Sequence, residues 1–111
     1  MAERIILMAK IEYYIRGNFN GKGIEKVSGY QFDIGNPPQT FYYTKYDDGK
    51  YVVTIPCNGM KVGEFDRLKD AKKFIAENMD KIVTKLSSEV YIEAEKRFRE
   101  MVDEAEGRMM I

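Results

Sequence analysis

Two tight-turn signals near the middle of the chain constrain its fold more than any other feature of the sequence. Asp48-Gly49 separates two runs that are rich in Tyr, Val and Thr, and Asn58-Gly59 separates the second run from Met60–Phe65. Such pairs favour two-residue hairpin loops of type I′, because both central positions of that turn need a positive φ. The sequence therefore predicts a three-stranded antiparallel meander, with Pro56 at an edge or a bulge because it lacks an N–H.

A two-residue loop at Asp48-Gly49 also determines which side chains share a face of the meander. In that register Tyr42, Val53 and Ile55 point to the core. The opposite face is predicted to be open, and it carries the candidate partner-binding residues Phe41, Tyr43, Lys45, Val52 and Thr54. Tyrosine is favoured at protein–protein hot spots, and aromatic rings beside basic groups also stack on nucleic-acid bases. This face is therefore the candidate surface for a protein partner or, alternatively, for nucleic acid.

An amphipathic helix is expected after the meander. Apolar residues recur at helical spacing from Leu68 to Leu86, and charged residues occupy most of the positions between them. Asp66 stands just before this stretch, where an aspartate typically caps a helix by accepting a backbone N–H of the first turn. We expect the helix to pack on one face of the sheet.

The apolar spacing continues into a strongly charged segment, residues 89–107. Its candidate self-association residues are Val90, Ala94, Phe98, Met101, Val102 and Ala105. A helix unbroken from residue 67 to 106 would span about 60 Å, which the sheet of so small a domain cannot cover. Either the helix folds back near Ser87-Ser88, or its end packs on a second chain. No Gly or Pro enforces a break at the two serines, which favours the second alternative, a homodimer.

The first forty residues are predicted to form a β-hairpin. In residues 4–16 the apolar side chains alternate along one side, as in a strand, although several of these residues are also helix formers. Ile24–Ile34 reads as the second strand, with Gly29 as a bulge. The chain is thus expected to be one α+β domain, residues 1–111, with about five antiparallel strands followed by one long or two consecutive helices. Its parts are the hairpin (1–40), the meander and helix (41–86) and the charged helix (87–111).

The stretch DGKYVVTIP from Asp48 to Pro56, followed by Asp66-x-Leu68-x-x-Ala71, resembles the core of HicB-type antitoxins. Domains of that family carry a D-G-G-Y-x-V strand that ends in Pro, and a D-T-L-x-E-A helix start. The resemblance covers residues 41–86, and the Pro-rich link of the family is replaced here by residues 56–60. No ribbon-helix-helix or helix-turn-helix module is evident after the core. The resemblance implies a meander packed on a helix and an inhibitor of a protein partner.

The composition gives little support to catalysis or metal binding. The 111 residues include no histidine and a single cysteine, Cys57. The commonest general base and metal ligand are therefore missing, and a zinc site of the Cys/His kind is excluded. We expect no enzymatic activity, no metal and no cofactor.

Charge and hydropathy bear on partners and location. Lys+Arg and Asp+Glu both number 18, a balance that is unfavourable for neutralising the phosphates of a nucleic acid. A lone cysteine suits a reducing compartment, and no run approaches the roughly 20 apolar residues that span a bilayer. We expect a cytoplasmic protein that does not bind membranes.

Together these features predict a non-enzymatic module that binds a protein partner and inhibits or regulates it. It would be antitoxin-like, or an antagonist of a host protein encoded by a phage or another mobile element. Two alternatives remain: a nucleic-acid-binding domain that uses the aromatic and basic sheet face, and a small-ligand-binding protein with a cleft between sheet and helices.

Overall fold

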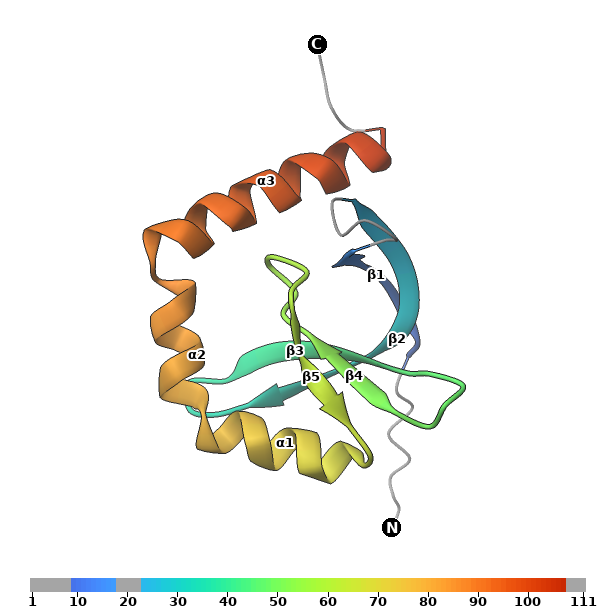
Figure 1. Ribbon diagram of the computed structural model, residues 1–111, viewed down its shortest axis with the longest axis vertical. Coiled ribbons are helices and arrows are strands. Elements are labelled where there is room, and N and C mark those ends of the chain that lie inside the picture. The colour runs from blue at the N-terminus through green and yellow to red at the C-terminus, as the bar shows by residue number, and fades with distance from the viewer. Residues whose placement is uncertain (1–8, 18–22, 108–111) are drawn as a thin grey trace.

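The computed structural model describes residues 9–17 and 23–107. Within these residues it has five strands and three helices, which are β1 (Ile11–Arg16), β2 (Ile24–Ile34), β3 (Gln39–Lys45), β4 (Tyr51–Thr54), β5 (Lys61–Phe65), α1 (Leu68–Glu77), α2 (Met79–Leu86) and α3 (Glu89–Ala105). The strands form one antiparallel sheet in chain order, and the helices follow it (Figure 1). The predicted α+β class is confirmed. The strand predicted over residues 4–16 is confirmed for Ile11–Arg16 and is wrong for Ala9 and Lys10, which precede β1 without regular structure, while its residues 4–8 lie outside the described residues.

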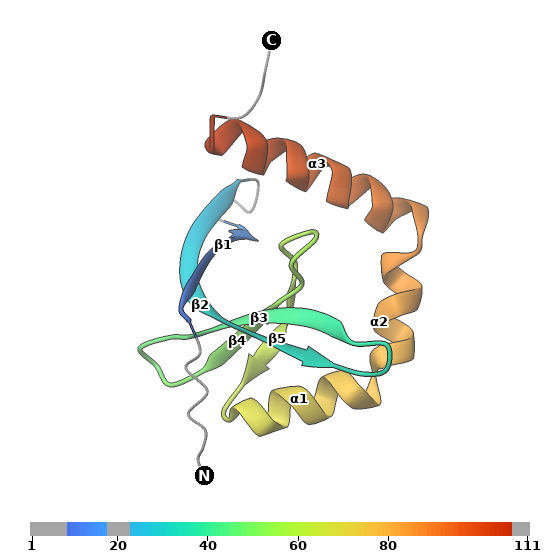
Figure 2. The same cartoon turned by 180° about the vertical axis from the view of Figure 1, so that it is seen from behind.

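Strand β2 bends strongly and changes its partner halfway along its length (Figures 1 and 2). Its residues 24–29 pair with β1, and its residues 30–34 pair with β3. Gly29 lies at this change, where an added Cβ would be only 2.0 Å from the carbonyl oxygen of Tyr43. The bulge predicted at Gly29 is wrong, because neither ladder contains an extra residue there. The glycine instead permits the close approach of two strands.

The loop between β3 and β4 is not the predicted two-residue type I′ turn. The Tyr46 N–H donates to the Lys50 carbonyl, and the Gly49 N–H donates to the Tyr46 carbonyl, both at 2.9 Å. Gly49 has φ +87°, whereas no non-glycine residue of the described chain has a positive φ, so Asp48 does not take the conformation that type I′ requires. The loop has three residues, and its last one is a left-handed glycine, the next most common kind of hairpin connection. The Asp48 carboxylate holds it by accepting the Lys50 N–H at 2.9 Å.

The extra loop residue shifts the pairing of β3 and β4 by one position. Tyr43 lies opposite Val53, and Tyr42 lies opposite Thr54. A slip of one residue moves every side chain of a strand to the other face. Phe41 and Tyr43 therefore face the helices and are only 2% and 8% exposed, so the open face that sequence predicted for them is wrong.

The main core lies between the sheet and α1. Its buried members are Phe32, Phe41, Tyr43, Val53, Ala71 and Ile75. A smaller cluster occupies the other face, where the ring of Tyr13 packs 4.7 Å from that of Tyr42 and its hydroxyl bonds to that of Thr44 at 2.5 Å. Burial raises the pKa of Tyr13, and Thr54 is buried beside this cluster. Both faces of the central strands are thus largely covered.

The helical segment begins without the predicted cap. The N-cap position of α1 is Arg67, which makes no side-chain capping bond. Asp66 instead accepts a hydrogen bond from the Lys50 ammonium at 2.5 Å, and this bond lowers the pKa of Asp66. The aspartate therefore links the start of the helix to the β3–β4 hairpin.

The unbroken helix from residue 67 to 106 is also wrong, because the segment breaks at Asn78 and at Ser87-Ser88. At the second break Ser88 is the N-cap of α3, and its hydroxyl accepts the Tyr91 N–H at 3.4 Å. Helix α3 then runs back past the β4–β5 loop to the end of β1 and the start of β2 (Figures 1 and 2). Of the two alternatives left open by the sequence, the chain takes the fold-back at the serines. No helix of the described ranges is both long enough and apolar enough to cross a membrane.

Candidate partner-binding surfaces

Arg16 joins three separate parts of the fold at the docking site of α3. Its Nε donates to the Asn58 carbonyl in the β4–β5 loop at 2.7 Å, and its Nη2 donates to the Ala94 carbonyl of α3 at 2.6 Å. The guanidinium also lies 5.5 Å from the ring centre of Phe98, within the range of a cation–π contact. Burial and the nearby charge of Arg97 lower the pKa of Arg16.

The C-terminal half of α3 is fixed by further contacts on the same side. The Phe98 ring is 5% exposed and packs against Gly59 of the β4–β5 loop. Just beyond the helix, Glu106 accepts a hydrogen bond from the Tyr14 hydroxyl and pairs with Lys26 at 3.2 Å. This half of the helix therefore belongs to the body of the fold.

The predicted self-association residues are divided by this docking. Phe98 is buried within its own chain, which leaves little of its ring for a contact with a second chain. Ala94, Met101 and Val102 are half-buried, and Ala105 is exposed. Val90, at 74% exposed, is the large apolar residue of the set that remains accessible.

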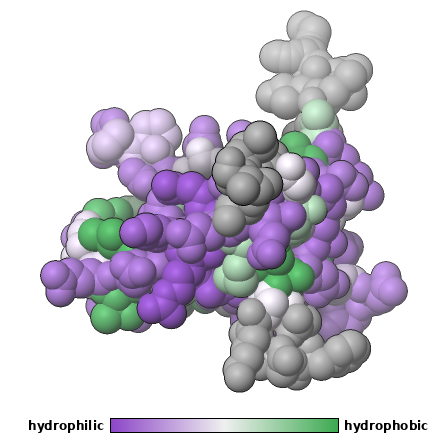
Figure 3. Space-filling view, turned by 90° about the horizontal axis from the view of Figure 1, so that it is seen from above, coloured by the Kyte–Doolittle hydropathy of each residue, from purple (hydrophilic) through white to green (hydrophobic). Residues whose placement is uncertain are grey.

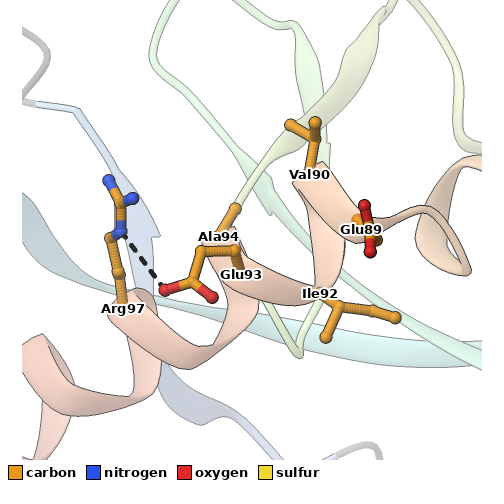
Figure 4. A pocket seen from close by; sticks show the side chains of 6 residues that line it. All are labelled: Glu89, Val90, Ile92, Glu93, Ala94 and Arg97. Atoms are coloured by element: carbon orange, nitrogen blue, oxygen red, sulfur yellow. Dashed lines mark ion pairs between the residues drawn. The ribbon is translucent and has the colours of Figure 1, made fainter.

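The accessible half of α3 carries a shallow hollow. It is lined by Glu89, Val90, Ile92, Glu93, Ala94 and Arg97. All six belong to one helix, Val90 and Ile92 point in different directions, and Arg97 lies 3.8 Å from the Glu93 carboxylate (Figure 4). Viewed from above, the molecule shows hydrophobic side chains in small separate groups among hydrophilic ones (Figure 3). This hollow has no second wall to hold a ligand.

The dimer prediction now concerns only this accessible half of α3. A dimer through it should dissociate into folded monomers on Val90→Asp, because the change puts a charge on the exposed end of the apolar stripe. Size-exclusion chromatography with light scattering measures this directly. If the unmodified protein already runs as a monomer at high micromolar concentration, the dimer prediction is wrong.

A second hollow lies on the sheet face opposite α1 and includes two of the predicted partner-binding residues, Val52 and Thr54. Its lining is mostly polar and charged, with both signs present: Arg16, Tyr46, Asp47, Asp48, Lys61 and Glu64 also contribute. Thr54 is buried, so of the five predicted partner-binding residues Val52 is the one that lines this hollow with an accessible side chain. Lys45 lies on the α1 side, 5.4 Å from the ring centre of Tyr51. The structure does not bring the five predicted residues together.

A third hollow has walls from several elements, and we call it the lysine-rimmed pocket. It lies in the angle between the β4–β5 hairpin and the three helices. The hairpin contributes Ile55, Met60, Lys61 and Val62. The helical segment contributes Phe74, Asn78, Lys81, Ile82, Lys85, Leu86 and Tyr91. Its volume is about 230 Å³.

The charges around this pocket all have one sign, because each charged residue in its lining is a lysine. Lys61 pairs with Glu64 at 2.8 Å. Lys81 and Lys85 form no ion pair with any residue in the described part of the chain. They are one helical turn apart on α2, so their ammonium groups lie on the same side of that helix. The floor of the pocket is apolar. Phe74 in this floor is 42% exposed, which is high for a large apolar side chain.

Sequence reasoning left open a cleft between sheet and helices but did not identify the residues of this pocket. Ile82 and Leu86 were assigned to a stripe that the sheet covers, and Tyr91 was assigned no role. The one available signal was the pair Lys81 and Lys85, at a spacing of four beside that apolar stripe. Tyr91 joins the lining only because α3 turns back at Ser88.

Two other chemical possibilities can be placed on the structure. Cys57 lies at the surface of the β4–β5 loop, and partial burial of its thiol together with Glu95 raises its pKa, which disfavours the reactive thiolate. In residues 9–17 and 23–107 no three thiol or carboxylate side chains gather in a way that would hold a metal ion. No protein-family model, curated protein sequence or solved structure matches the chain.

Proposed function

We propose that this protein is a non-enzymatic binding module that recognises a protein partner and inhibits or regulates it. The observation that carries the proposal is the lysine-rimmed pocket, an apolar hollow with a rim of one charge on an otherwise charge-balanced chain. Apolar pockets with a polar rim are the usual sites for the anchor residues of protein interfaces. The resemblance of residues 41–86 to HicB-type antitoxins adds the expectation of an inhibitor.

The two alternative functions have less support from the geometry. The nucleic-acid alternative relied on an open aromatic face, but Tyr43, its central residue, is buried in the core. The small-ligand alternative needs a larger apolar pocket with several walls, because sites for drug-sized ligands and cofactors are typically about 300–1,000 Å³. The hollow on α3 and the hollow opposite α1 reach about 620 and 570 Å³, but the first is lined by one helix alone and the second mostly by polar and charged residues. The lysine-rimmed pocket, at about 230 Å³, is below this range and suits a single inserted side chain.

Partner capture with matched variants tests the proposal. The full-length chain is immobilised in three forms: unmodified, Lys81→Glu/Lys85→Glu, and Lys69→Glu/Lys73→Glu. Both double variants change the net charge equally, but Lys69 and Lys73 lie on α1 outside the pocket lining. A protein bound through the pocket should be captured by the unmodified chain and the α1 variant, and lost with the α2 variant. Equal capture by all three forms, or none by any, contradicts the proposed function at this site.

A further inference from the structure

We infer that the lysine-rimmed pocket selects an acidic segment of its partner, which inserts one large apolar side chain between the β4–β5 hairpin and α2. The inference rests on the proposed function and adds the chemistry of the partner to it.

The size of the pocket sets what can enter it. An apolar cavity of about 150 Å³ binds benzene, so the volume of about 230 Å³ accommodates one aromatic or leucine-sized side chain. Phe74 and Tyr91 offer ring surfaces for such an anchor, on which aromatic side chains pack favourably. Met60 is unbranched and flexible, which lets the wall adapt to the shape of the anchor.

The charges around the pocket set what can flank the anchor. Lys81 and Lys85 stand on the α2 side of the entrance. Lys61 also lines the pocket, but it lies opposite Thr54 in the ladder and pairs with Glu64, so the two lysines of α2 supply the unpaired positive charge. Since Lys81 and Lys85 have no carboxylate partner in the described chain, they are available to Asp or Glu side chains of the bound segment. Charge complementarity at the edge of an interface mainly raises the association rate and excludes partners of the wrong sign. A basic segment would place its charges against these lysines, and the pocket therefore discriminates against it.

A protein segment fits these features better than a nucleic acid. Binding to a phosphate backbone relies on many cationic contacts, whereas this rim offers three lysines, one already paired with Glu64. The apolar floor of the pocket would contribute nothing to a contact with a phosphate backbone. The combination of one apolar hollow and a few cations matches an acidic peptide with a hydrophobic anchor.

A displayed library of random short peptides tests the inference on the full-length chain. Selected peptides should be enriched in Asp and Glu around one Phe, Leu, Ile or Trp, and their binding should weaken as salt is added. Replacing the anchor by Ala, or using the Lys81→Glu/Lys85→Glu chain, should each weaken binding at least about tenfold. The Lys69→Glu/Lys73→Glu chain should bind as the unmodified chain does. Amide NMR signals of residues 81–91 should shift on titration with a selected peptide.

The possible outcomes separate the inference from the proposed function. If selected peptides bind at the pocket but are neutral or basic, the acidic partner is wrong and the proposed function stands. If no peptide of any composition is selected and partner capture also fails, both are wrong. The unmodified chain is also tested with a single-stranded DNA oligonucleotide and with anionic phospholipid vesicles. If it binds either one more tightly than any selected peptide, and the α2 variant loses that binding, the pocket belongs to that ligand and the inference is overturned.

Discussion

Replacing Tyr43 with alanine should lower the free energy of unfolding by about 3–5 kcal/mol, the range seen when a buried large aromatic side chain is truncated. Tyr43 is 8% exposed, and its ring centre lies 5.7 to 5.9 Å from those of Tyr30, Phe32 and Tyr51. The change would remove the central ring of this aromatic group and leave a cavity beside Val53. Urea unfolding followed by circular dichroism measures the loss.

The matched control is Lys45→Ala, two residues along the same strand and on the same face. Lys45 is exposed, and its main contact is a cation–π interaction with Tyr51, which is worth about 0.5–1 kcal/mol at such a site. We therefore expect a change of less than about 1 kcal/mol. A Tyr43→Ala variant as stable as the Lys45→Ala variant would place Tyr43 outside the core and restore the register predicted from the sequence.

The contrast between these two residues shows where sequence reasoning reaches its limit. The strands around Asp48-Gly49 were predicted from their composition and alternation, and both exist. The face of β3 was inverted because a three-residue loop replaced a two-residue loop, whereas Val53 of β4 points to the core as predicted. Asp-Gly is compatible with both loops, since Gly49 supplies the positive φ in either case. The two loops differ in the register of β3 against β4. The alternation of side chains along one strand does not determine that register.

The helical segment shows a second limit of a different kind. Its apolar spacing predicted a helical segment, but the break at Ser88 depends on a capping bond and on the attraction of α3 to a distant site. That site consists of Arg16, Gly59 and the carbonyl of Asn58, which are separated from α3 by many residues. Tertiary contacts therefore decide whether the helical segment continues or breaks at Ser88, where no Gly or Pro does so. The lysine-rimmed pocket depends on this break. Its lining therefore could not be predicted while the sequence left both a continuous helix and a fold-back open.

Gly59→Ala is expected to detach α3 from the β4–β5 loop. Gly59 has φ +70°, which costs an alanine about 1–2 kcal/mol, and the added Cβ would lie 2.3 Å from the Phe98 ring. The ring cannot stay in place, and overpacking of this kind typically costs about 1–3 kcal/mol. We expect a total loss of about 2–5 kcal/mol in the free energy of unfolding, together with faster amide hydrogen exchange along α3.

Gly49→Ala separates the two costs, because Gly49 has a similar φ of +87° but no atom within 4 Å of an added Cβ. This variant should lose only the backbone cost of about 1–2 kcal/mol and leave hydrogen exchange in α3 unchanged. Combining Gly59→Ala with Phe98→Ala should cost less than the sum of the two single changes, because the clash disappears when the ring does. If Gly59→Ala and Gly49→Ala are equally stable and equally protected in α3, Phe98 does not pack on Gly59 and α3 does not dock on the β4–β5 loop.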